Sequence, residues 1–131
     1  MITILVDYNL EGQAALLSGT YHSEGWAELL PLRFLRFKDV GLSHDSNDRE
    51  VWRFAQASQM ILLTGNRNMK DEVSLEQTLR AENTPTSLPV LTIGNVERVA
   101  ERRYRERCVT RLAEIVSELE NYLGASRLFI P

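Results

Sequence analysis

The chain has 131 residues, 44% of them hydrophobic and 25% charged, a balance typical of one globular domain with a single core and not of a disordered chain. A formal net charge of -3 at pH 7 argues against non-specific attraction to nucleic acid over the whole surface, although a local basic face could still bind it. The single cysteine, Cys108, excludes an intrachain disulfide and any zinc site built from cysteines.

The sequence shows no sign of membrane insertion. No apolar run nears the roughly 18 residues that a membrane-spanning helix requires. The first residues are apolar but form a short run without the basic start of a signal peptide. We therefore expect a soluble cytoplasmic protein that makes no membrane contact.

The N-terminal third predicts one strand and two helices. Residues 2–6 form a β-rich run, and Asp7 ends it. Residues 10–17 suit a helix, which we expect Gly19 to end. A second short helix is expected over residues 24–30, where a proline follows.

A second strand and a third helix come next. Residues 32–38 place apolar residues between basic ones, a pattern that indicates a strand. The polar residues 43–48 predict a loop. Asn47, followed three residues later by Glu50, resembles a capping box and predicts that a helix over residues 49–58 begins there.

Asp48 is expected to point inward from the start of this helix. Val51, Trp52 and Ala55 form the inner face of the helix, and Asp48 lies three and four residues before the first two of them. Its carboxylate should therefore face the interior and not the solvent.

The stretch from Met60 to Asn68 organises the chain. Its first four residues are apolar and predict a strand buried on both faces, and the polar residues 64–68 mark the end of that strand. Ligands of α/β sheets sit at the carboxyl ends of strands. If the strands over residues 2–6 and 60–63 are parallel neighbours, Asp7 and Asn66 lie on one rim.

The remainder predicts two helices and two strands. We expect a weakly patterned helix over residues 70–81, a loop over 83–89, a strand over 90–93, a long helix from 94–95 to about 123 that Gly124 ends, and an edge strand over 127–130. The long helix carries an apolar stripe of residues spaced by three or four: Tyr104, Cys108, Leu112, Ile115, Leu119 and Tyr122.

Strands that alternate with helices predict the α/β class. The expected architecture is a single three-layer domain spanning residues 1–131, in which a mostly parallel sheet of four to five strands carries helices on both faces.

The order of these motifs resembles the PIN-like family and, more narrowly, its small DUF5615 group. The resemblance lies in a strand ending at Asp7, a helix beginning at Asp48, and a strand ending at Thr64, and it covers roughly residues 1–70. It implies a metal-dependent ribonuclease of the toxin–antitoxin type, with Mg²⁺ or Mn²⁺ held by acidic residues at the strand ends. The implied partners are single-stranded RNA, an antitoxin-like protein and a second copy of the chain.

Carried over to this sequence, the resemblance makes Asp7 and Asp48 metal ligands and catalytic residues. The family has aspartates where this chain has Asn66 and Asn68, and these amides would orient water or substrate. Three further residues beside these positions are candidates for contacting the substrate: Asn9, Thr64 and Arg67.

The two amides weaken the expected metal site. An amide oxygen can coordinate Mg²⁺ but brings no negative charge, whereas holding two ions needs several carboxylates. One weakly held Mg²⁺ or Mn²⁺ is therefore expected in place of a full two-metal centre. Nearby acids that could substitute are Asp45, Asp71 and Glu72.

Each of these residues also has a structural interpretation. Asp7 could cap the next helix or form an Asx turn, Asp48 could stabilise a helix N-terminus, and Asn66 and Asn68 could be turn residues. The chain would then be a catalytically inactive PIN-like module that binds or assembles. The sequence leaves both functions open.

Arginines along the predicted long helix suggest a second candidate surface. They form two rows, Arg98, Arg102 and Arg105 on one side and Arg103, Arg107 and Arg111 on another. Such rows could bind RNA phosphates or an acidic partner. Interspersed glutamates equally favour a solvated helix with local ion pairs.

Overall fold

A single five-stranded parallel sheet forms the centre of the molecule. The structure is a computed structural model and describes residues 1–65 and 74–131. The strands lie in the order β2-β1-β3-β4-β5, and every neighbouring pair is parallel. Their bounds are β1 Ile2–Val6, β2 Leu32–Leu35, β3 Met60–Thr64, β4 Val90–Thr92 and β5 Arg127–Phe129. The predicted α/β class is confirmed.

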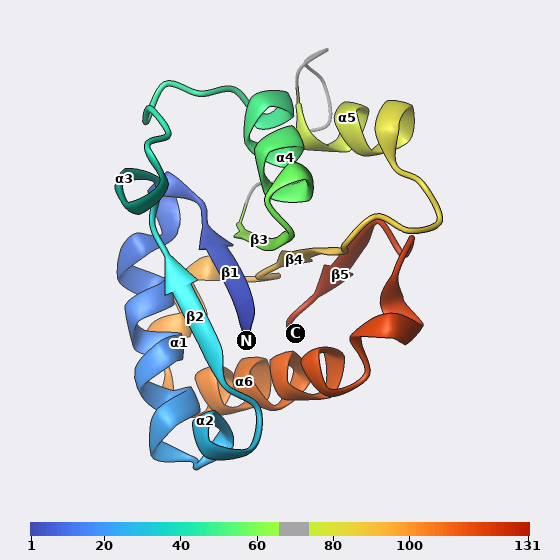
Figure 1. Ribbon diagram of the computed structural model, residues 1–131. Helices are drawn as coiled ribbons and strands as arrows, with labels where there is room; N and C mark the ends of the chain where they lie inside the picture. Colours follow the sequence, from blue (N-terminus) through green and yellow to red (C-terminus); the bar gives the residue numbers. More distant parts are fainter. Residues whose placement is uncertain (66–73) are drawn as a thin grey trace.

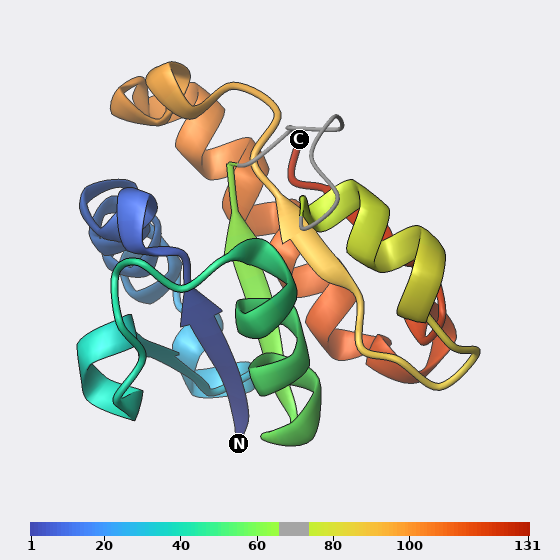
Figure 2. The same cartoon turned by 90° about the horizontal axis from the view of Figure 1, so that it is seen from above.

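Helices cover both faces of this sheet. The α-helices are α1 Glu11–Ser23, α2 Trp26–Leu29, α3 Phe37–Val40, α4 Asp48–Ala57, α5 Leu75–Glu82 and α6 Arg102–Ser117. The described part of the chain also has 3₁₀ turns before α1 (η1 Tyr8–Leu10), before α6 (η2 Val96–Ala100) and after α6 (η3 Leu119–Tyr122). In Figure 1 the sheet lies between α4 and α5 above and α6 below, and Figure 2 shows α4 and α5 in front of the strands.

The alternation of side chains along the strands divides the core into two parts. On β1, Ile4 and Val6 pack on the side of α1 and α6, whereas Leu5 packs on the side of α4 and α5. On β3, Ile61 and Leu63 face the first side and Leu62 the second. Both faces are apolar because helices exclude water from each of them.

β3 is the middle strand, as its apolar run predicts. It pairs with β1 on one side and with β4 on the other, and residues 61–64 are all buried. Since all five strands run in the same direction, the carboxyl ends of β1 and β3 meet at one edge of the sheet.

The predicted start of α4 is confirmed. Asn47 precedes the helix, and its side-chain oxygen accepts a hydrogen bond from the Glu50 amide at 2.9 Å, while the Glu50 side chain bonds back to the Asn47 amide. Val51, Trp52 and Ala55 are buried on its inner face.

The prediction that Gly19 ends the first helix is wrong. α1 continues to Ser23, because Leu17 and Tyr21 on its inner face are fully buried in the core and hold the helix past this glycine. The residue that turns the chain is Gly25, whose φ of +83° lies in the left-handed region that favours glycine.

Two boundaries between residues 24 and 38 also differ from the prediction. The short helix α2 begins after Gly25 at Trp26, not at Glu24. β2 ends at Leu35, and the expected strand residue Phe37 instead begins α3. A capping box between Arg36 and Asp39 starts this helix, and the guanidinium and amide of Arg36 together lower the pKa of the Asp39 carboxyl.

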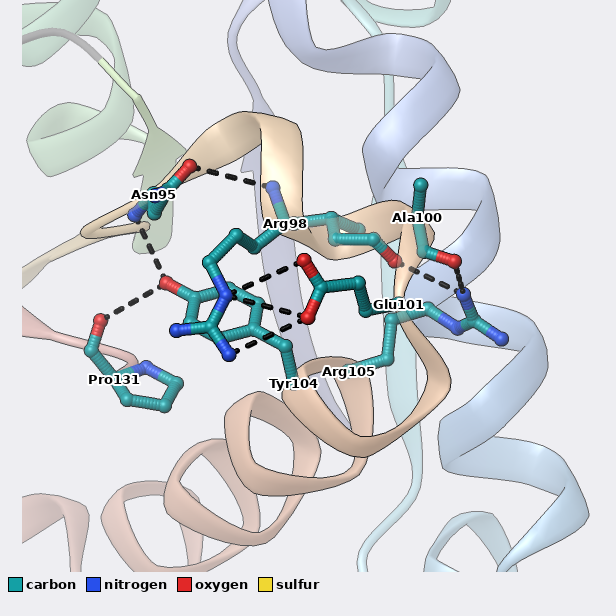
Figure 3. Close-up of polar contacts among 8 residues, drawn as sticks. Asn95, Arg98, Ala100, Glu101, Tyr104, Arg105 and Pro131 are labelled. Carbon is teal, nitrogen blue, oxygen red and sulfur yellow. Dashed lines mark hydrogen bonds and ion pairs between the residues drawn. The ribbon is translucent and has the colours of Figure 1, made fainter.

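The predicted helix from 94–95 to about 123 is broken into η2, α6 and η3. At Glu101 the backbone is extended (φ -85°, ψ 126°). The Arg105 guanidinium donates hydrogen bonds to the carbonyls of Val99 and Ala100, both at 2.9 Å. The Tyr104 hydroxyl accepts a hydrogen bond from the Asn95 amide at 2.9 Å (Figure 3). These contacts stabilise the bend, which the apolar spacing of the sequence does not reveal.

The other C-terminal predictions hold in outline. α5 covers part of the helix expected over residues 70–81, and residues 66–73 lie outside the described part of the chain. β4 and the edge strand β5 form as predicted, and Gly124 has a φ of +80° where the chain turns after η3. Among the residues with described positions, no helix is both long and apolar enough to cross a bilayer.

Candidate functional site

A cleft of about 480 Å³ opens at the carboxyl ends of β1 and β3. The strand ends, η1, the loop before α4 and the start of α5 all contribute to its walls. The residues that line it are Asp7, Tyr8, Asn9, Leu10, Phe37, His44, Ser46, Asp48, Val51, Leu62, Thr64, Gly65, Leu75 and Val96.

Asp7 is fixed at the rim by β3. Its amide donates a hydrogen bond to the Leu63 carbonyl at 2.9 Å, which continues the pairing of the two strands by one residue. The hydroxyl of the buried Thr64 donates to Asp7 Oδ2 at 2.7 Å. An ionised carboxylate is a strong acceptor for such a bond, so its orientation is defined before any ligand arrives.

Asp48 lines the same cleft from the start of α4. It is the first residue of α4, and its Oδ2 accepts a hydrogen bond from the Leu75 amide at 2.9 Å. Leu75 begins α5, so the carboxylate satisfies one of the amides that a helix N-terminus leaves without an intrahelical partner. The predicted inward direction of Asp48 is confirmed.

The structure therefore brings together the acids that the sequence places far apart. Asp7, Asp48 and Thr64 line one cleft, together with the predicted substrate-contacting Asn9. Gly65 also lines the cleft, and a side-chain carbon at this position would collide with Val96. Asp7, Asp48 and Thr64 thus line one cleft, and the chemical roles assigned to them stay predictions.

Other candidates fall outside this arrangement. Asp45 does not line the cleft; its exposed carboxylate lies 3.1 Å from the His44 ring. The remaining predicted site residues lie outside the described ranges: Asn66, Arg67, Asn68, Asp71 and Glu72.

The donor set suits a hard cation but is small. Within residues 1–65 and 74–131, no three His, Cys, Asp or Glu side chains converge closely enough to hold a metal ion. Asp7 and Asp48 are the two carboxylates that line the cleft in the described part of the chain. Mg²⁺ is commonly bound by one or two carboxylates, with water and substrate phosphate completing the shell. The two acids thus fit one ion shared with a phosphate and not a closed protein cage.

Three aromatic side chains of the cleft were not predicted from the sequence. Tyr8 directly follows Asp7, and this adjacency to a strand-end acid is a signal that could have identified it. Phe37 lies in the strand expected over residues 32–38, and His44 lies in the loop expected over residues 43–48. Both reach the cleft only through the path of the chain around α3.

The arginine rows are largely engaged within the chain. Arg98 pairs with Glu101 at 3.3 Å and lies over the Tyr104 ring, Arg102 pairs with Glu106, and Arg105 holds the bend before α6. The second row lines a separate shallow groove of about 600 Å³ beside β5: Arg103, Arg107 and Arg111.

Comparisons of the chain with protein-family models, with curated proteins and with solved structures gave no match.

Proposed function

We propose that the chain is a PIN-like, metal-dependent ribonuclease that cleaves single-stranded RNA in the cytoplasm, with Asp7 and Asp48 at its site. The observation that carries the proposal is that these two acids line one cleft at the carboxyl ends of β1 and β3. This edge is where α/β sheets bind ligands. The resemblance of the sequence to the PIN-like family supplies the reaction type.

In this proposal Asp7 and Asp48 hold one Mg²⁺ or Mn²⁺. When bound, the ion offsets the negative charge of a phosphodiester and makes a nearby water more acidic. Thr64 holds the Asp7 carboxylate through Oδ2, and no hydrogen bond to Oδ1 is found among the described residues. Asp7 thus keeps one oxygen for a ligand without turning its side chain.

The proposal is tested by cleavage of an end-labelled single-stranded RNA with Mn²⁺ or Mg²⁺. We expect Asp7→Asn and Asp48→Asn to lower the rate by roughly 10²-fold or more, because each loses a charge that acts on the transition state. Glu120→Gln is the matched control, since this exposed acid on η3 lies outside the cleft and should keep the full rate.

Two results would contradict the assignment. If Asp7→Asn cleaves as fast as the wild type, the activity belongs to a contaminant. If the wild-type protein cleaves no RNA with either metal, the chain is not a ribonuclease.

A catalytically inactive PIN-like binding or assembly module is the second candidate. One observation favours it: Asp48 Oδ2 already accepts the Leu75 amide, which is a sufficient structural reason for an acid at this position. The ligand would then be an antitoxin-like protein or a second copy of the chain. RNA cleavage that depends on both Asp7 and the metal would exclude this candidate.

A further inference from the structure

Three aromatic rings form a row along one wall of the cleft. Tyr8 lies in the middle, with its ring centroid 6.3 Å from that of Phe37 and 5.4 Å from that of His44. Phe37 is buried, whereas Tyr8 and His44 are both exposed. We call these three residues the ring shelf.

The position of the shelf is fixed by local structure. Tyr8 begins the 3₁₀ turn that follows Asp7, and the Leu10 amide closes this turn on the Asp7 carbonyl at 2.9 Å. Phe37 begins α3 and anchors the shelf in the core beside Leu5 and Val51. The Tyr8 ring thus contacts the anchored Phe37 ring, while about half of the Tyr8 residue stays exposed to solvent.

The ring shelf and the two carboxylates of the proposed site belong to one cleft. The shelf residues line the same cleft as Asp7 and Asp48. Two carboxylates repel a phosphate that no cation accompanies, whereas a flat uncharged ring meets no such repulsion at the shelf. The Tyr8 ring is tilted by 44° to the Phe37 ring and by 37° to the His44 ring, so a further ring can stack on the exposed part of Tyr8 and meet His44 at its edge.

We infer that the ring shelf binds a nucleobase of the RNA strand, which stacks on Tyr8 with its edge against His44 while the adjacent phosphate lies at Asp7 and Asp48. The inference rests on the proposed function, because a base reaches the shelf as part of a strand held at the carboxylates. Stacking on an aromatic face tolerates any base, so the shelf would position the strand without selecting a sequence.

The test compares two labelled probes by fluorescence anisotropy: a short single-stranded RNA and an abasic ribose-phosphate strand of equal length. Ca²⁺ replaces Mn²⁺ so that binding is measured without cleavage. We expect Tyr8→Ala to weaken RNA binding by roughly 5- to 150-fold, the range that corresponds to one stacked base. Binding of the abasic strand should be unchanged.

Two further variants separate stacking from folding. Tyr8→Phe keeps the ring and should bind RNA as the wild type does, and His44→Ala should weaken RNA binding. His22→Ala is the matched control, since His22 is exposed on α1 and its ring bonds to the Ser18 carbonyl, away from the cleft.

The inference is overturned if the wild type binds the two probes equally or binds neither, or if Tyr8→Phe is as weak as Tyr8→Ala. These failures are distinguishable from failure of the proposed function. RNA cleavage that still depends on Asp7 would keep the ribonuclease while removing the shelf, whereas loss of cleavage dependence on Asp7 would remove the ribonuclease itself.

Discussion

The hydrogen bond from Thr64 Oγ1 to Asp7 Oδ2 joins the last residue of β3 to the residue that follows β1. Thr64 is buried, so its hydroxyl needs a partner, and the carboxylate supplies one. The same bond that satisfies a buried donor therefore fixes the acid that we assign to the site. The Thr64–Asp7 hydrogen bond therefore serves both the stability of the fold and the proposed site.

A second residue, Cys108, gives a prediction on pH dependence. It is fully buried on α6, its thiol donates to the Ile130 carbonyl at 3.3 Å, and burial raises its pKa to about 11. The folded state therefore retains the thiol proton after the unfolded chain has lost it. As pH rises from about 9 to about 11, this difference favours unfolding.

We predict that the free energy of unfolding of the wild type falls by about 1 kcal/mol more than that of Cys108→Ala between pH 7.5 and pH 10. Urea titrations of both proteins at the two pH values measure this difference. The phenol of Tyr21, whose pKa burial also raises, is common to both proteins and cancels. Burial is also the main cause of the raised pKa of Tyr104, but Cys108 adds to it, so the measured difference includes the coupling of these two side chains. An equal fall in both would show that Cys108 is not shielded from solvent.

At the scale of single residues, the sequence predicted those side chains whose direction follows from local periodicity. Asp48 is the example, because its place relative to Val51 and Trp52 determines its face. The sequence could not identify Leu75 as the partner of Asp48, or His44 as a neighbour of Tyr8, since both contacts depend on the path of loops between elements.

At the scale of elements, α1 offers a test of where the helix ends. Gly19 lies inside α1, and a methyl group added there would contact nothing within 4 Å. Glycine costs a helix interior roughly 0.5–1 kcal/mol relative to alanine. We predict that Gly19→Ala raises the free energy of unfolding by about this amount, measured by urea denaturation.

Gly25→Ala is the matched control for this prediction. It also has open space around it, but its φ of +83° disfavours a residue with a side chain, so the substitution should destabilise the protein. Should Gly19→Ala destabilise the protein as much as Gly25→Ala, the helix would end before residue 19.

The strands were more predictable than the helix boundaries. Buried runs such as Met60–Thr64 leave few alternatives, because an apolar stretch this short between polar segments suits a strand covered on both faces. The break at Glu101 depends on Arg105, which also donates to Thr20 of α1 at 3.1 Å. A contact across 85 residues leaves no trace in the local pattern of the helix.

At the scale of the molecule, strand order creates the site. β1 and β3 are neighbours although β2 lies between them in sequence, so their carboxyl ends meet and bring Asp7 beside Thr64. α4 and α5 pack on one face of the sheet and carry Asp48 to the same edge. Both acids reach the cleft through rigid elements, an arrangement that favours a defined ligand geometry.

Isothermal titration of Mn²⁺ into the wild type, Asp7→Asn, Asp48→Asn, the double variant and Glu120→Gln is the most direct test of a single shared site. We expect each cleft substitution to weaken Mn²⁺ binding at least about tenfold, and the double variant to lose less binding free energy than the sum of the two single losses. Glu120→Gln, an exposed acid outside the cleft, should bind as the wild type does. Mn²⁺ binding that is unchanged in Asp7→Asn, or equally weakened in Glu120→Gln, would show that the two cleft acids do not share an ion.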